Sequence, residues 1–343
     1  MKPQTPDEVL ALLDGSSTSA ALGAAMELGL FWLLAERPLA LPEIAGELNI
    51  PPRRCSYWLD LLCKAGLLEE RSEGYAPTAT ARESILDVYS QDTWALLAEE
   101  SRERFRVLGD LPSHLGEPGS VWEIQGLSPP MYIDQMSEEP ERARRFTRML
   151  FELHEPLAAE LAEFLDLSGA KRLLDLGGGS GVVSMALARR YPEMAFTVVD
   201  IPNVCIAGRE LAAEHDLADR IAYNPADFLT DELPSGFDVA LECDVNVYSE
   251  ALFRKVRKAL DPGGRFLIVD QFAPAEGIAP PPRLHWAFAG ALIRPDYAFP
   301  TAAQIKDQLE RAGFELLPDL RLPSAPGPSE RMTGGMIVIE ARA

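Results

Sequence analysis

The sequence predicts an α/β chain of two units, in which a mostly helical N-terminal part precedes a mostly parallel sheet. Two observations support this fold class. Apolar residues recur at helical spacing between Ser19 and Gly66, whereas short strand-like apolar runs alternate with helical stretches after Lys171. A chain of 343 residues is also longer than a single hydrophobic core usually supports.

The first 90 residues contain signals for three helices and a β-hairpin. Ala21 and Leu28 belong to an apolar stripe at helical spacing, and Pro42 starts a short second helix. A third helix follows two prolines and ends near Gly66, after which the chain turns near Gly74 between two short strands. This order of elements predicts a winged helix over residues 1–90.

The charge of the chain argues against a nucleic-acid partner for this winged helix. The chain has 32 Lys and Arg against 53 Asp and Glu, a formal charge of −21, and residues 1–100 alone contain 7 basic and 16 acidic side chains. Such a surface repels phosphates. We therefore interpret the winged helix as a dimerisation module and expect a homodimer. A transcriptional regulator, the alternative, would need a basic recognition face.

Features elsewhere favour a cytoplasmic protein with no membrane partner. The start, MKPQTPDEVL, is polar and acidic and has no apolar signal core. The longest apolar runs, such as Trp286–Ile293, are shorter than the ~20 residues that span a bilayer. The four cysteines are scattered, so we expect neither a disulfide framework nor a zinc site.

A helical linker over residues 91–170 leads to the predicted sheet domain of residues 171–343. Its strand candidates are RLLDL, FTVVD, FDVALEC and RFLIVD, with helical stretches between successive pairs. Near the C-terminus, ELLPDLRL and MIVIEAR are separated by SAPGPSERMTGG, which favours an antiparallel hairpin at the sheet edge.

The strongest motif is Asp175-Leu-Gly177-Gly-Gly179-Ser-Gly, where the first strand ends and a helix begins. Glycines let the backbone turn sharply and approach a ligand, and the helix start supplies free N–H donors. The third glycine of the dinucleotide fingerprint would fall at Val182, and the carboxylate of Asp175 would repel a pyrophosphate. This loop therefore favours a ligand with a cationic or neutral end, such as an amino acid.

Two further carboxylates follow the next two strands. Asp200 closes FTVVD, where a carboxylate can accept from both hydroxyls of a ribose. Asp227 could accept from an adenine amine, and Phe228 could lie on the adenine ring. Each acid alone could be a solvated helix cap, but acids at successive strand ends favour one ligand. A nucleoside joined to an amino acid without phosphates is S-adenosylmethionine (SAM).

The chain resembles class I methyltransferases of the caffeate and hydroxyindole O-methyltransferase type. In the sheet domain the resemblance is carried by DLGGGSG, VVDIPNV, DRIAYNPADFL and LDPGGRFLIVD, and before it by AAMELGLFWLLA, CKAGLLEE and MYIDQMSEEPERARRFTRML. This resemblance spans nearly the whole chain. It implies a winged-helix dimerisation domain, a Rossmann-like SAM-binding domain and an obligate homodimer. It also implies a cofactor site that includes Gly177, Gly179, Asp200, Asp227 and Phe228, bordered by the linker residues Phe146 and Met149. We expect Asp175 and Cys243 in the cofactor site as well, and Phe146 and Met149 in the acceptor pocket.

The chain departs from the family at its general base. Family members follow the fourth strand with an LHDW-like segment whose His deprotonates the acceptor, and Val247 takes the place of that His here. Tyr248, next in the chain, and His285, on the helix that lines the acceptor pocket with Trp286, are the remaining candidates. Their segments resemble those of the C-methylating bacteriochlorophyllide C-20 methyltransferase. The alternative is that both side chains are ordinary packed residues without a catalytic role.

Together these observations predict a SAM-dependent methyltransferase of secondary metabolism that acts on a small aromatic or conjugated acceptor, with O-methylation favoured. One alternative is C-methylation of a large ring. The other is a SAM-binding relative with non-methylating chemistry. Asp244 and Asn246 could suggest a magnesium site. Metal-dependent catechol methyltransferases lack the N-terminal domain, however, so we expect no metal.

Overall fold

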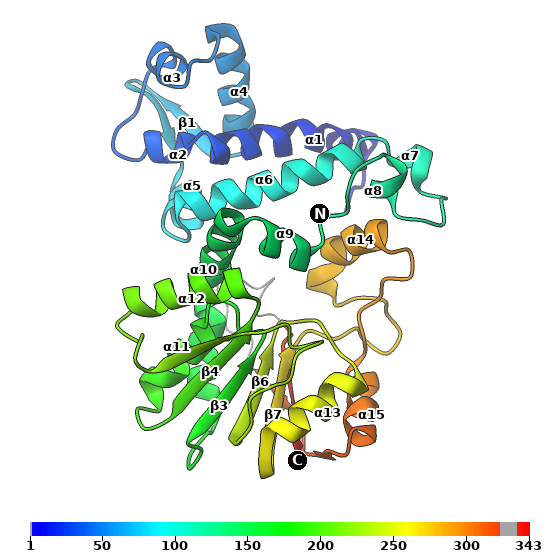
Figure 1. The fold of residues 1–343 in the computed structure, drawn as a ribbon. Coiled ribbons are helices and arrows are strands. Elements are labelled where there is room, and N and C mark those ends of the chain that lie inside the picture. The colour runs from blue at the N-terminus through cyan, green and yellow to red at the C-terminus, as the bar shows by residue number, and fades with distance from the viewer. Residues whose placement is uncertain (1, 323–334) are drawn as a thin grey trace. The chain divides into compact units, whose positions relative to one another are not determined.

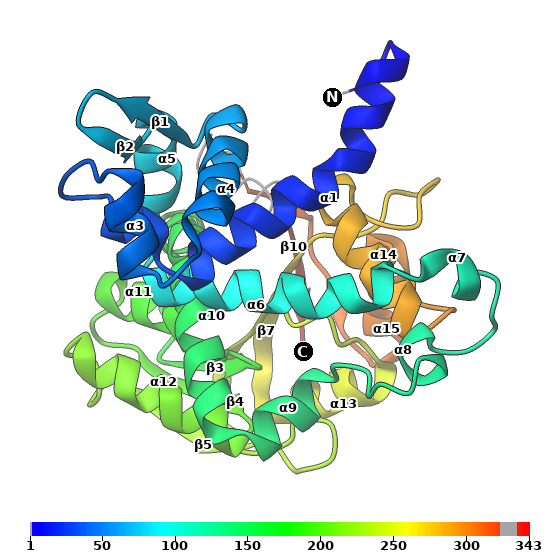
Figure 2. The same cartoon turned by 90° about the horizontal axis from the view of Figure 1, so that it is seen from above.

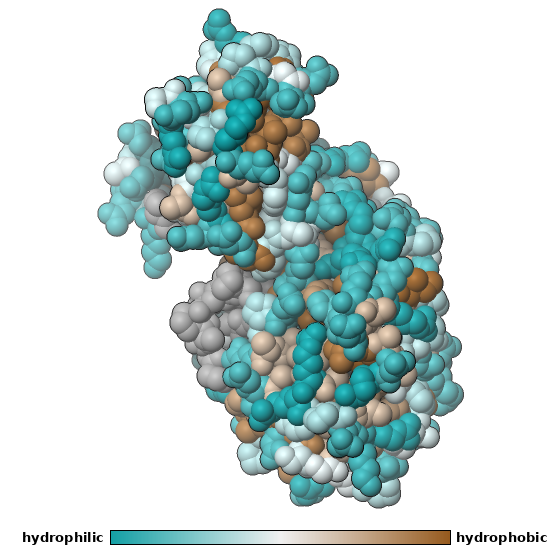
Figure 3. Space-filling model, turned by 90° about the vertical axis from the view of Figure 1, so that its left-hand side faces the viewer, coloured by the Kyte–Doolittle hydropathy of each residue, from teal (hydrophilic) through white to brown (hydrophobic). Residues whose placement is uncertain are grey.

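The computed structural model describes residues 2–322 and 335–343 and divides the chain into two compact units, Met1–Ser113 and His114–Ala343. Figure 1 shows the helical N-terminal unit and the α/β unit that holds the sheet. The predicted fold class is confirmed. Figure 3 shows a mostly hydrophilic face on which hydrophobic side chains gather in a few patches, as the composition of the chain leads one to expect.

The N-terminal unit contains the predicted helices and hairpin. Its elements are α1 Pro6–Glu27, α2 Leu30–Leu33, α3 Leu41–Glu47, α4 Pro52–Lys64, β1 Leu68–Arg71, β2 Gly74–Pro77, α5 Ala79–Ala81, η1 Arg82–Leu86, α6 Gln91–Leu108 and α7 Leu111–His114. Helix α1 begins earlier than the periodicity indicates, because Thr5 caps it by accepting from Glu8 N. Helices α1 and α6 pack against each other, as Figure 2 shows.

One face of α1 remains apolar and exposed within its own unit. Leu10, Leu12 and Leu13 are 56%, 62% and 71% exposed. Among the described residues, α1 is also the one helix whose length and composition would suffice to cross a membrane, although such a helix near an N-terminus is weak evidence. The predicted lack of a membrane partner stays a prediction.

The second unit is built around a twisted sheet. Its elements are α8 Val121–Ile124, α9 Tyr132–Glu138, α10 Pro140–Phe164, β3 Arg172–Leu176, α11 Val182–Arg190, β4 Ala195–Asp200, α12 Pro202–Glu214, β5 Ile221–Pro225, β6 Phe237–Cys243, α13 Glu250–Ala259, β7 Leu260–Asp270, η2 Pro281–Arg283, α14 Leu284–Ile293, α15 Ala302–Arg311, β8 Glu315–Leu316, β9 Leu320–Arg321 and β10 Ile337–Arg342. The strand order is β5-β4-β3-β6-β7-β10-β8, and β9 pairs with β10.

Strands β3 to β7 run parallel, and β10 is antiparallel to β7. The predicted antiparallel edge is therefore confirmed, while most of the connecting segment SAPGPSERMTGG lies outside the described residues. Successive residues of β3 enter separate cores: Leu173 packs with Leu161 of α10, and Leu174 packs with Phe253 of α13. Burial on both faces explains why these strands are continuous apolar runs.

The chain order creates a topological switch point at the carboxyl ends of the central strands. From β3 the chain proceeds outward to β4 and β5 and then returns to pair β6 with the other side of β3. Ligands of open α/β sheets bind at such a switch point, because the loops that leave the two strands diverge there. The loops after β3 and β6 therefore define where the site should be.

Substitutions of Gly74 and Gly66 test whether close backbone contact, in addition to positive φ, requires glycine in the hairpin. Gly74 has φ +130°, and a Cβ on it would lie 2.3 Å from the backbone of Leu39, whereas a Cβ on Gly66, at φ +75°, would meet nothing within 4 Å. We expect Gly74→Ala to lower the free energy of unfolding by about 3 kcal/mol, from backbone strain and displacement together. Gly66→Ala should cost about 1 kcal/mol from strain alone. Equal losses in urea unfolding would contradict this account.

Candidate functional site

Contacts from neighbouring elements fix the conformation of the glycine loop after β3. Gly177 N donates to Val199 O at 2.8 Å, which joins the loop to β4. A Cβ on Gly181 would lie 2.4 Å from the hydroxyl of Tyr223, so only glycine fits there. At Gly179, in contrast, a Cβ would meet nothing within 4 Å. The backbone at Gly179 is therefore open to a ligand.

Asp200 holds this loop from the end of β4. Its buried carboxylate accepts from Gly179 N at 2.9 Å and from Ile201 N at 2.8 Å. Burial raises the pKa of Asp200 to about 6, against the opposing effect of the two hydrogen bonds. Each oxygen retains a further lone pair, so the carboxylate can still accept from two hydroxyls.

Asp175 lies beneath the loop instead of on its open side. Its carboxylate is 1% exposed and accepts from Ser184 Oγ at 2.6 Å. A Cβ on Gly178 would lie 2.4 Å from the carboxyl carbon of Asp175, which shows how closely the loop rests on it. Burial raises the pKa of Asp175 to about 6. The predicted contact with a ligand's amino group stays a prediction.

Three loops converge on Gly177. A Cβ there would lie 2.9 and 3.0 Å from the methyl groups of Val245, after β6, and 3.4 Å from a ring atom of Phe228, after β5. The carboxylate of Asp227 accepts from Leu229 N and from Thr230 Oγ1, both at 2.9 Å, and so shapes its own turn. The structure thus places Phe228 beside the glycine loop.

The other predicted ligand-binding residues lie near the same strand ends. Phe146 on α10 packs against the cluster of Ile201 and Val204, which directly follow Asp200. Met149 is buried one turn further along α10. Cys243 ends β6, where burial raises the pKa of its thiol well above the usual range.

These residues fit SAM on the evidence of the structure. The open position at Gly179 admits a ligand against the backbone, and the carboxylate of Asp200 stands beside it. Phe228 provides an aromatic side chain at the same loop. The combination of a hydroxyl acceptor, a glycine cradle and an aromatic ring suits a nucleoside joined to an amino acid.

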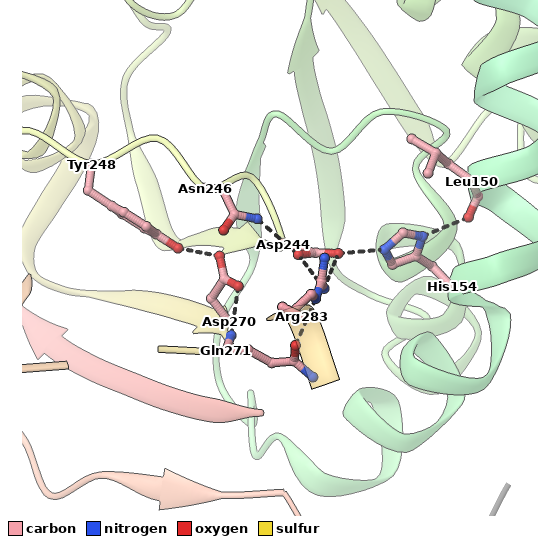
Figure 4. Close-up of polar contacts among 8 residues, drawn as sticks. All are labelled: Leu150, His154, Asp244, Asn246, Tyr248, Asp270, Gln271 and Arg283. Atoms are coloured by element: carbon pink, nitrogen blue, oxygen red, sulfur yellow. Dashed lines mark hydrogen bonds and ion pairs between the residues drawn. The ribbon is translucent and has the colours of Figure 1, made fainter. Parts of the chain in front are cut away.

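A network of charged side chains surrounds Asp244, directly after β6 (Figure 4). Arg283 Nη2 donates to both carboxylate oxygens, at 2.8 and 2.9 Å, and Asn246 Nδ2 donates to Oδ1 at 3.0 Å. His154 Nε2 lies 3.1 Å from Oδ2, while its Nδ1 lies 2.8 Å from Leu150 O. The hydrogen bonds and charges of His154 and Arg283 keep the pKa of Asp244 below its usual value despite burial.

Tyr248 belongs to a second buried group on the same side of the sheet. Its hydroxyl donates to the carboxylate of Asp270, at the end of β7. Burial, and then the charges of Asp270 and Glu242, raise the pKa of Tyr248 far above its usual value. Burial and the charge of Asp244 raise the pKa of Asp270 to about 7. Tyr248 therefore remains a neutral donor.

His285 lies apart from Tyr248. It is exposed on α14, and no hydrogen bond joins it to Tyr248 in the described part of the chain. Trp286 is 46% exposed and packs on Tyr297 and Phe299, with ring centroids 5.8 and 5.4 Å away. Val247, which we expect at the position of the family's base, packs with Tyr248 against a core cluster. The catalytic roles of His285 and Tyr248 stay predictions.

Three residues of these groups, His154, Arg283 and Asp270, were not predicted from the sequence as site residues. Asp270 follows the pattern that identified Asp200, because it is an acid at the carboxyl end of an apolar strand. His154 and Arg283 gave no comparable signal, since they meet Asp244 across 90 and 39 residues of chain. In the described ranges, no group of three or more His, Cys, Asp or Glu is arranged to hold a metal ion.

Comparison with known proteins now identifies the family. Residues 117–315 match the O-methyltransferase domain, and residues 10–85 match the O-methyltransferase dimerisation domain. Among curated relatives, the 3-hydroxy-5-methyl-1-naphthoate 3-O-methyltransferase of Streptomyces sahachiroi is 33% identical over 77% of this chain and 76% of its own. The L-tyrosine C(3)-methyltransferase of Streptomyces lavendulae is 30% identical over 88% and 85%.

Solved structures show the same fold. Human N-acetylserotonin methyltransferase in complex with SAM matches with a TM-score of 0.79 and 21% identity, covering 99% of this chain and 98% of that one. The O-methyltransferase model covers more than half of the 343 residues. The chain therefore belongs to the O-methyltransferase family and is a SAM-dependent methyltransferase with a dimerisation domain.

Proposed function

We propose that this enzyme transfers the methyl group of SAM to a small aromatic acceptor, with oxygen as the favoured atom. The observation that supports this most directly is the glycine loop at the switch point, where Asp200 accepts from Gly179 N beside an open backbone position. We assign Gly177, Gly179, Asp200, Asp227, Phe228 and Cys243 to the cofactor site, and Phe146, Met149 and Trp286 to the acceptor pocket. Residues 1–90 form the dimerisation domain, residues 91–170 the linker that contributes to the pocket, and residues 171–343 the catalytic domain.

In this proposal, the chain accelerates transfer mainly by holding the reactants in line and excluding water. When bound, SAM supplies a methyl group already activated on a sulfonium. Asp200 fixes the ribose and Phe228 contacts the adenine ring, while the aromatic side chains around Trp286 orient the acceptor. Tyr248 acts through Asp270 as a positioning residue, because its phenol donates to that buried carboxylate and stays neutral. His285, which is exposed, remains the candidate base.

C-methylation is the second candidate function. Val247 replaces the family's general base and packs into a core cluster, so the loop after β6 offers no proton acceptor at that position. An electron-rich ring carbon can attack a sulfonium methyl before any deprotonation: the C–CH3 bond forms as the S–CH3 bond breaks, and the proton of the ring carbon then leaves to His285 or to water. The tyrosine C(3)-methyltransferase among the relatives performs such a reaction. Incubation with methyl-labelled SAM and a metabolite extract, read by mass spectrometry, would identify the atom methylated.

Asp200 provides the direct test of the cofactor assignment. Loss of the carboxylate removes charge-assisted hydrogen bonds, so Asp200→Asn should weaken SAM binding in calorimetry by about 10- to 100-fold. Asp219→Asn, an exposed carboxylate on the same unit, should bind SAM like the natural chain. Unchanged SAM affinity in a folded Asp200→Asn protein would remove Asp200 from the cofactor site.

Asp175 should make stability depend on pH. Its pKa of about 6 in the folded chain exceeds the unfolded value, so its contribution to stability is complete below about pH 4 and is lost as the pH rises through 6. Asparagine mimics the neutral form and removes this dependence. Between pH 5 and pH 8 the natural chain should therefore lose about 1–2 kcal/mol more stability than Asp175→Asn. Parallel pH profiles in urea unfolding would show that Asp175 is not held with a raised pKa.

We infer that the exposed face of α1 packs on a second copy of the chain. Leu10, Leu12 and Leu13 lie within the residues that match the dimerisation domain. The double substitution Leu12→Glu with Leu13→Glu should convert a dimer to a monomer in analytical ultracentrifugation while circular dichroism stays unchanged. Ile206→Glu alters an apolar side chain that is 52% exposed on α12 and should leave the dimer intact. A dimer that survives the double substitution would exclude this face as the interface.

A further inference from the structure

The cluster of His154, Asp244 and Arg283, here called the Asp244 cluster, has no role in the cofactor site described above. Its side chains are 13%, 8% and 11% exposed. They come from α10, from the loop after β6 and from η2, so three separate segments of the second unit meet there. Burying three ionisable groups costs solvation energy unless their charges are compensated. The balance of positive and negative charge among these three side chains therefore decides what the cluster can bind.

The hydrogen-bond geometry fixes the protonation of His154. A backbone carbonyl only accepts, so Nδ1, at 2.8 Å from Leu150 O, must carry a proton. The carboxylate of Asp244 is ionised, because Arg283 donates to both of its oxygens. Nε2 faces that acceptor at 3.1 Å and must carry a proton as well. His154 is therefore an imidazolium, and it cannot act as a base in this arrangement.

The three side chains of the Asp244 cluster consequently carry one net positive charge, from two cations and one carboxylate. The nearby carboxylate of Asp270, whose pKa is raised to about 7, also interacts with Arg283 and is not part of this count. Both oxygens of Asp244 are fully used, by Arg283, His154 and Asn246. Arg283 Nε donates to Gln271 Oε1 at 2.7 Å and its Nη2 donates to Asp244. Its Nη1 has no partner among the described residues and is not sealed from solvent. One pair of guanidinium N–H donors is thus left for a ligand.

The position of the cluster points to the acceptor. Asp244 directly precedes Val245, whose methyl groups fill the space beside Gly177. Three residues after Arg283, Trp286 presents a half-exposed ring that packs on Tyr297. The cluster is thus linked along the chain to Val245 at the glycine loop and to the exposed ring of Trp286, and a cation placed between such groups suits a flat molecule that bears an anion.

We propose that Arg283 Nη1, within the positively charged Asp244 cluster, binds a carboxylate of the aromatic acceptor. The enzyme is thereby selective for aromatic carboxylates over their neutral counterparts. This inference rests on the proposed function, since it places the acceptor of that reaction beside the glycine loop. It gives Arg283 a specificity-determining role and His154 a positioning role, in which its charge keeps Arg283 from being neutralised by Asp244.

The test compares 1-naphthoate with its uncharged amide, 1-naphthamide, by calorimetry on the full chain saturated with S-adenosylhomocysteine. We expect at least tenfold tighter binding of naphthoate to the natural chain. Arg283→Met should abolish the preference, and Arg283→Lys, which keeps the charge, should retain part of it. Arg254→Met, an exposed cation on α13, should leave the preference unchanged.

His154 provides a second, independent measurement. Nitrogen-15 NMR should show both ring nitrogens of His154 protonated at pH 7.5, and His154→Gln should reduce the preference for naphthoate by removing the extra charge. Equal binding of the two compounds, binding of neither, or a neutral His154 ring would overturn the proposal. SAM binding is measured in parallel on every variant. If SAM does not bind the natural chain, the proposed function fails, whereas SAM binding without a preference for naphthoate refutes this inference alone.

Discussion

The hydrogen bond between Gly179 N and the carboxylate of Asp200 is the interaction on which the site depends. It joins the turn after β3 to the end of β4 and fixes Gly179, the position of the glycine loop at which a Cβ would meet nothing within 4 Å. The surrounding side chains support the same geometry from other directions, with Asp175 beneath the loop and Phe228 beside it. Parallel strands make this possible, because their carboxyl ends meet at one edge of the sheet.

The loop after β6 is held by packing and by one buried hydrogen bond. Val247, which we expect at the position of the family's base, packs against a core cluster, and the hydroxyl of Tyr248 donates to Asp270. This hydrogen bond stabilises the loop conformation. Such a loop still positions Val245 against the glycine turn, so its structural function is separable from acid–base chemistry.

The features predicted correctly from the sequence are those with short-range signals. Apolar runs bounded by acids and glycines located β3, β4, β6 and β7, and the spacing of prolines and glycines located the helices and hairpin of the first unit. Strand order also predicts Asp200 and Phe228 at one cofactor site; the structure places Asp200 at Gly179 and Phe228 beside Gly177, while their contact with a cofactor stays a prediction. These signals suffice because each strand in a parallel sheet ends at the same edge.

The sequence could not reveal the Asp244 cluster. His154 lies on a helix and Arg283 follows three prolines, and neither context differs from that of an ordinary surface residue. His154 and Arg283 contact Asp244 only because α10 and η2 pack against the loop after β6, and this packing depends on the whole unit. The composition could not indicate this cluster either, because a formal charge of −21 says nothing of where two buried cations meet one carboxylate.

The raised pKa of Asp200 has a consequence for the proposed cofactor site. A carboxylate with a pKa of about 6 is partly protonated in mildly acidic solution, whereas hydroxyl donors bind its ionised form best. With the cofactor on Asp200 as proposed, binding in that range expels a fraction of a proton. The apparent affinity for the cofactor then falls with acidification.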